Sequence, residues 1–80
     1  MTAEQIAELL REITGETGIG PQTRLDADLV IDSLELAALA VALNQRYGVD
    51  LPAYIAGLTL DEIIELNVTD VAGFVEASRI

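Results

Sequence analysis

Apolar residues recur at helical spacing in four stretches of the chain. The pattern predicts helices over about residues 3–14, 33–47, 60–66 and 68–77, the third of them short. Residues 51–58 are also apolar, but they contain Pro52 and Gly57, so we expect a linker packed on the core. No stretch predicts a strand with a partner. The expected fold class is therefore all-α: a small four-helix bundle of three main helices and one short helix, with a long first loop.

The ends of these helices carry recognisable start and stop residues. Residue pairs that can cap a helix start are Thr2 with Gln5, Asp32 with Glu35, Thr59 with Glu62, and Asn67 with Asp70. Gly15 and Gly48 suit the left-handed residue that ends a helix. Between the first two helices, residues 15–31 lack any period and are held by apolar anchors at Leu25, Leu29 and Ile31. A loop this long in so small a domain indicates binding or processing beside it.

Length and charge narrow the class of protein. Eighty residues are enough for one domain, which we place at residues 1–80. Fourteen acidic residues against four arginines give a net charge of −10, which repels nucleic acid and anionic membranes and favours basic protein partners. We see neither a membrane span nor a secretory signal, so the expected location is cytoplasmic, and the expected state is a monomer.

Missing residue types exclude several chemistries. The chain has no cysteine, histidine or lysine, which rules out disulfides, thiolate or imidazole metal sites, and catalysis by Ser-His or Cys-His pairs. Asp26, Asp28 and Asp32 lack the glycine and terminal glutamate of a calcium loop, so no metal site is predicted. Acidic residues spaced by four along the first helix are interpreted as its solvated side. We expect a protein that is not an enzyme.

Residues 28–34, Asp-Leu-Val-Ile-Asp-Ser-Leu, place a serine hydroxyl at the first turn of a helix, next to an acid and at the end of the long loop. A phosphodiester on Ser33 would lie where free backbone N–H groups and the helix dipole favour an anion. The segment resembles the D-S-L attachment motif of acyl carrier proteins. The resemblance extends to the acidity, the helix spacing and the Tyr-Gly-Val-Asp-Leu-Pro run over 47–52, and so covers essentially the whole chain.

The resemblance implies a non-catalytic carrier in which Ser33 receives 4′-phosphopantetheine from a phosphopantetheinyl transferase. Leu34 would then provide an apolar contact beside the hydroxyl, and Asp32 would position the serine or engage the metal of the transferase. Further partners implied are an acyl- or aminoacyl-loading ligase or acyltransferase, and ketosynthase or condensation-type enzymes. We expect them to contact Glu35, Ala38, Val41 and Arg46 on the second helix. The resemblance also implies an acyl-chain pocket between the second and third predicted helices, lined by Leu36, Leu39, Leu43, Leu58, Ile63 and Ile64.

Two differences from the carriers of fatty acid synthesis narrow the expected type of carrier. Carriers of fatty acid synthesis usually have glycine where Val30 stands, and they line the second helix with acids where this chain has mostly Ala, Val and amide residues. We therefore expect a freestanding carrier of polyketide or nonribosomal-peptide type, with acyl cargo held as a thioester. Two alternatives stay open: an aminoacyl or peptidyl carrier, and an unmodified acidic helical interaction module.

Overall fold

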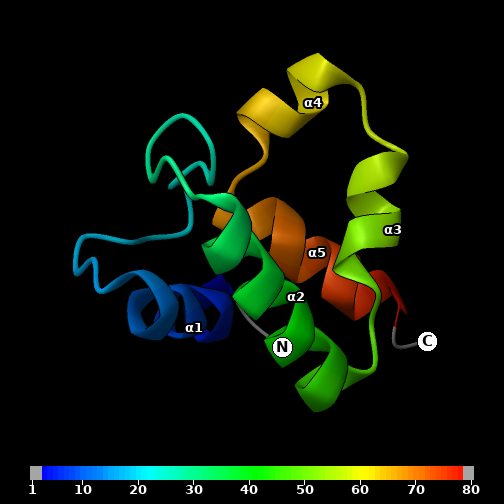
Figure 1. The fold of residues 1–80 in the computed structure, drawn as a ribbon, viewed down its shortest axis with the longest axis horizontal. Helices are drawn as coiled ribbons and strands as arrows, with labels where there is room; N and C mark the ends of the chain where they lie inside the picture. The colour runs from blue at the N-terminus through cyan, green and yellow to red at the C-terminus, as the bar shows by residue number, and fades with distance from the viewer. Residues whose placement is uncertain (1–2, 79–80) are drawn as a thin grey trace.

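The computed structural model describes residues 3–78. The helices in that part of the chain are α1 (Ala3–Thr14), α2 (Ser33–Tyr47), α3 (Leu51–Ala56), α4 (Leu60–Glu65) and α5 (Val68–Ser78) (Figure 1). The described residues form no strand, although Arg24 and Asn67 make one isolated bridge. The expected all-α fold, a small helical bundle, is confirmed.

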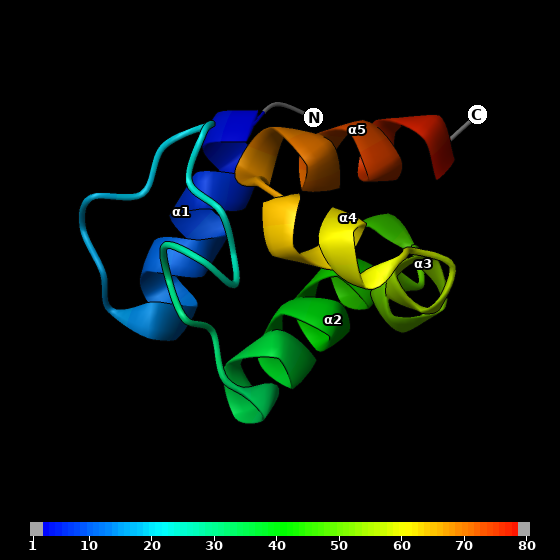
Figure 2. The ribbon, with the colours of Figure 1, turned by 90° about the horizontal axis from the view of Figure 1, so that it is seen from above.

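The core lies where α1, α2 and α5 meet (Figure 2). Each of these helices contributes side chains with no exposed surface: Ile6 and Leu10 from α1, Leu39 and Leu43 from α2, and Val68, Val71 and Val75 from α5. These residues recur at spacings of three and four, so each helix turns one apolar face inward. Because α2 is fixed along this inner face, its first turn and its outer face are presented on the surface.

The prediction of a linker over residues 51–58 is wrong, because residues 51–56 form the helix α3. Asp50 caps this helix: its carboxylate accepts a hydrogen bond from the Ala53 N–H at 3.1 Å. Pro52 lies in the first turn, where a helix has no need of the N–H that proline lacks. The fold is therefore a bundle of five helices over the described residues, with α3 packed against α2.

The other helix ends agree with the sequence pattern. Gly15 and Gly48 adopt left-handed φ values of 76° and 70° at the ends of α1 and α2. The start of α4 is the predicted capping box of Thr59 and Glu62. Asn67 and Asp70 exchange side chain to backbone hydrogen bonds of 3.1 and 2.8 Å at the start of α5. The predicted cap of the first helix involves Thr2, which lies outside the described residues.

Residues 15–32 form the predicted long loop, which runs beside α1 and ends at the start of α2 (Figure 2). Two buried side chains, Ile19 and Leu25, attach it to the core. Hydrogen bonds hold it elsewhere: Arg11 Nη2 donates to the Ile19 carbonyl at 2.8 Å, and the Leu25 N–H donates to the Leu66 carbonyl at 3.0 Å. These contacts therefore fix the position of the residues just before α2.

Candidate functional site

The first turn of α2 is held by two carboxylates. Asp32 Oδ1 accepts a hydrogen bond from the Glu35 N–H at 2.7 Å, and Glu35 Oε1 accepts one from the Asp32 N–H at 3.2 Å. This reciprocal pair is the predicted capping box. It fixes the position of Ser33, the first residue of the helix, between the two acids.

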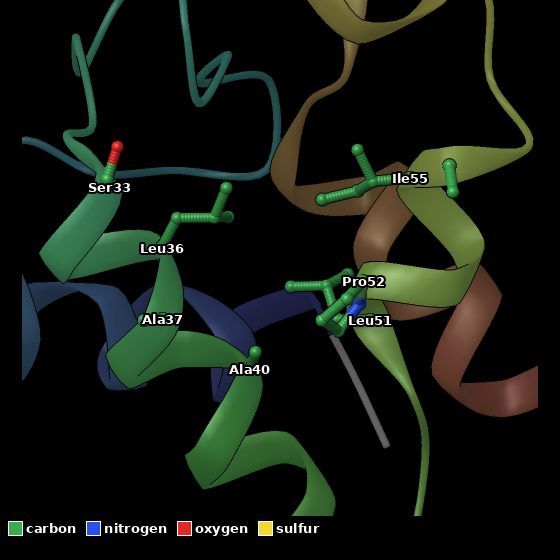
Figure 3. Close-up of a pocket in the computed structure, with 8 residues that line it drawn as sticks. Ser33, Leu36, Ala37, Ala40, Leu51, Pro52 and Ile55 are labelled. Atoms are coloured by element: carbon green, nitrogen blue, oxygen red, sulfur yellow. The ribbon is translucent and has the colours of Figure 1, made fainter.

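The Ser33 hydroxyl is available for chemistry. Ser33 is exposed, and its hydroxyl makes no hydrogen bond with any described residue. Figure 3 shows the hydroxyl at the head of α2, pointing away from the helix body. The N–H groups of Ser33 and Leu34 belong to the first turn and have no carbonyl partner in the described chain. With the positive end of the helix dipole, they favour a phosphate on this oxygen.

An apolar cavity of about 390 Å³ opens beside Ser33, between α2 and α3 (Figure 3). Apart from Ser33 its lining is apolar: Leu36, Ala37, Ala40, Leu51, Pro52, Ile55 and Ala56. The alanines on α2 and α3 leave the room that larger side chains would fill. Its volume falls within the range of sites that hold small molecules, about 300 to 1,000 Å³.

A second cavity, of about 110 Å³, lies next to the first. Leu36 and Ile55 line both cavities, and in Figure 3 their side chains point toward one another. The smaller cavity is otherwise lined by Leu25, Asp26, Ile31, Ile63 and Leu66. Leu36 and Ile55 therefore form the wall between the two cavities.

The predicted acyl-pocket residues are distributed over several places. Leu36 lines both cavities and Ile63 lines the smaller one. Leu39 and Leu43 are fully buried in the core. Leu58 lines a separate hollow next to Tyr54 and Glu62, and Ile64 is partly exposed on α4. A role for these six residues in holding cargo stays a prediction.

Sequence reasoning missed the α3 wall of the larger cavity. We expected a pocket between the second helix and the helix predicted over residues 60–66, and the smaller cavity is lined by residues from both. The larger cavity, beside Ser33, lies instead between α2 and α3. The sequence does contain a signal for α3: Asp50, followed by Pro52 two residues later, is a typical helix start. The apolar run after Pro52 would then have indicated a wall facing α2.

The predicted docking residues lie on the outer side of α2. Leu34 is 83% exposed and Val41 is 56% exposed, and Ala38 is exposed between them. Their spacing of four and three places them on one face of the helix. Glu35 is half-buried in the first turn, and Arg46 is exposed in the last. This arrangement gives an apolar strip with an acid near Ser33 and a cation at the far end.

An ion-pair cluster stabilises the loop just before this site. Asp28 Oδ2 accepts hydrogen bonds from the Arg24 backbone N–H at 2.8 Å and from Arg24 Nε at 3.3 Å. The backbone hydrogen bond, followed by the bond from the guanidinium, lowers the pKa of Asp28. Glu65 lies 3.7 Å from the same guanidinium, and both acids, Asp28 first, raise the pKa of Arg24. The cluster joins the loop to the end of α4.

Within residues 3–78, no group of three or more acidic side chains is arranged to hold a metal ion. No helix in that range is long and apolar enough to cross a membrane.

Comparison with known proteins identifies a family. A family model described as a phosphopantetheine attachment site matches residues 4–66, which run from α1 past the end of α4. No curated protein and no solved structure matches the chain. Domains of this family bind 4′-phosphopantetheine covalently on a serine, are generally non-catalytic, and interact with phosphopantetheinyl transferases and biosynthetic enzymes.

The first turn of α2 fits such a group, because it offers an exposed hydroxyl, two free backbone N–H groups and an adjoining apolar cavity. The match covers well over half of the chain. The protein therefore belongs to the phosphopantetheine attachment family, that of the acyl carrier proteins.

Proposed function

We propose that Ser33 is the attachment serine, and that the protein carries acyl intermediates of polyketide or related synthesis and presents them to successive enzymes. The observation that carries this proposal is the exposed, unbonded Ser33 hydroxyl at a helix start on the rim of an apolar cavity. When bound, the phosphopantetheine arm supplies a thiol to which cargo is joined as a thioester. A tethered cargo reaches each docked enzyme at high effective concentration.

In this proposal the residues around Ser33 have separate roles. The N–H groups of Ser33 and Leu34 stabilise the phosphate negative charge at the helix start. Asp32 uses Oδ1 to cap the helix, which leaves Oδ2 to engage the metal of the transferase. Leu34, almost fully exposed, offers an apolar contact next to the reacting oxygen.

The cavity lining supports acyl cargo over aminoacyl cargo. Apart from the Ser33 hydroxyl, its walls are aliphatic. Moving a hydrocarbon chain from water to such walls is favourable by about 25 cal/mol per Å² of apolar surface buried. An ammonium group in the same place would lose its hydration without gaining a partner.

Modification of the two serine variants tests the attachment site. The sequence contains only two serines, Ser33 and Ser78, so Ser78→Ala is a matched control for Ser33→Ala. Incubation with coenzyme A, magnesium and a broad-specificity transferase should add one arm to the wild type and to Ser78→Ala, and none to Ser33→Ala. Intact mass spectrometry measures the addition. An arm on Ser33→Ala, or a wild type that several transferases leave unmodified, would overturn the proposal.

A further inference from the structure

Val30 has a backbone conformation that its side chain disfavours. Its φ is +51°, and it is the only residue other than glycine with a positive φ among residues 3–78. A β-branched residue is a rare occupant of this left-handed region, because its Cβ substituents crowd the backbone. The side chain recovers little of that cost by packing, since Val30 is 74% exposed.

The surrounding loop holds Val30 in this conformation. The Val30 N–H donates to the Asp26 carbonyl at 3.1 Å, and the next N–H, that of Ile31, donates to the Leu25 carbonyl at 3.1 Å. Leu29 and Ile31, on either side, are partly buried against the core. The turn is thus fixed by its neighbours, in the way that strained residues at functional sites usually are. Glycine would satisfy the same turn without strain.

Val30 lies within reach of any enzyme that acts on Ser33. Three residues of chain separate the two Cα atoms by at most about 11 Å. A protein contact of about 800 Å² per partner has a radius near 16 Å, so an enzyme centred on Ser33 covers Val30 as well. Leu34, the residue after Ser33, is also exposed and apolar. Three acids, Asp26, Asp28 and Asp32, lie within four residues of Val30 in the sequence. Asp28 is paired with Arg24, so the excess negative charge near Val30 comes from Asp26 and Asp32.

We propose that the Val30 side chain is a specificity contact for the enzyme that attaches the arm to Ser33. The partner surface this contact fits is an apolar spot bordered by basic residues, which match the acids around Val30. The inference rests on the proposed function, because it requires Ser33 to be the attachment serine. It explains why an exposed valine occupies a position that a glycine would fill without strain.

Three variants of Val30 distinguish the effect of losing the side-chain contact from the effects of relieving backbone strain and of loosening the loop. Val30→Gly and Val30→Asn both fit the left-handed turn and remove the isopropyl group, but asparagine leaves the loop stiffer. Val30→Ile keeps the apolar contact and the strain. The measurements are kcat/KM for arm transfer, with the transferase that modifies the wild type best, and the melting temperature.

We expect kcat/KM to fall about 5- to 20-fold for both Val30→Gly and Val30→Asn, and to stay within about twofold for Val30→Ile. The melting temperature of the first two should rise by about 3 to 6 °C as the strain is relieved. If either of them is modified as fast as the wild type, this inference is overturned while the proposed function stands. A wild type that no transferase modifies overturns both.

Discussion

Asp32 and Glu35 hold the start of α2 in one geometry while they leave Ser33 unbonded between them. Both carboxylates accept hydrogen bonds from backbone N–H groups, so they fix the position of Ser33 without bonding to its hydroxyl. A third acid, Asp28, acts on the same segment from the other side by fixing the turn that begins at Arg24. The position of Ser33, the proposed attachment residue, therefore depends on carboxylates that accept hydrogen bonds from neighbouring backbone N–H groups.

The pairing of Asp28 with Arg24 predicts a pH-dependent contribution to stability. Because the folded state lowers the pKa of Asp28 below its ordinary value of 3.8, the unfolded chain binds its proton first as the pH falls. The stabilisation is present above the ordinary pKa and is lost as the pH drops through the folded pKa. Asp28→Asn should lower the melting temperature at pH 7 by a few degrees at most, since the pair is exposed.

Asp26→Asn is the matched control, because it removes the same charge from the same loop without breaking an ion pair. Melting curves between pH 7 and pH 2 should show the Asp28→Asn deficit shrinking toward zero in acid, with little deficit for Asp26→Asn at any pH. A deficit for Asp28→Asn that persists at pH 2 would contradict the assignment to its charge.

At the scale of helices, local signals predicted most of the fold. The caps at Asp32, Thr59 and Asn67 and the glycines at the helix ends fixed boundaries that the structure confirms. The prediction failed at α3, because Pro52 and Gly57 were interpreted as marks of a linker. The equally short α4 was predicted from its capping box, whereas the corresponding signal at Asp50 and Pro52 was not used. The cavity wall was missed with it, since a cavity depends on how two helices face each other. The positive φ of Val30 could not be predicted either, because it depends on hydrogen bonds within the folded loop and on the packing of Leu29 and Ile31 against the core.

The outer face of α2 gives a prediction about docking. Ala38 is exposed between Leu34 and Val41, so Ala38→Glu should leave folding intact and put an unpaired charge into an apolar interface. We expect a cost of about 1 to 3 kcal/mol in docking, seen as a rise in KM of the loaded carrier with its pathway enzyme.

Ala77→Glu, which makes the same change at an exposed position near the end of α5, is the control. It should leave KM unchanged. An unchanged KM for Ala38→Glu would show that the partner docks elsewhere, and a collapsed melting temperature would show that Ala38 supports the core.

On the scale of the whole molecule, a net charge of −10 is carried by a very small protein. The protein measures 30 × 25 × 22 Å, and its accessible surface of 4706 Å² is that of a compact chain of 8.5 kDa. Among residues 3–78, Arg11 and Arg24 are engaged by acids. Most of the carboxylates therefore have no arginine partner, and they repel one another over distances shorter than the length of the molecule.

Screening should therefore stabilise the fold. The Debye length is about 30 Å at 0.01 M salt, as long as the protein, and only a few ångströms at 0.5 M. We expect the melting temperature at pH 7 to rise by several degrees between these two salt concentrations. Near the isoelectric point of about 4.1 the net charge vanishes, and the same salt series should change little. A flat response at pH 7 would contradict the role assigned to self-repulsion.

The ring of Tyr54 on α3 stacks on that of Phe74 on α5, with centroids 4.3 Å apart and planes 14° from parallel. The sequence has no tryptophan and only two tyrosines, so its intrinsic fluorescence comes from Tyr47 and Tyr54 alone. Tyr54 belongs to the helix that walls the cavity, and the stack is what a cargo must disturb if it pushes α3 away from α2. If a long chain enters the cavity as proposed and displaces α3, the environment of Tyr54 should change, and the tyrosine emission should report it without any added label.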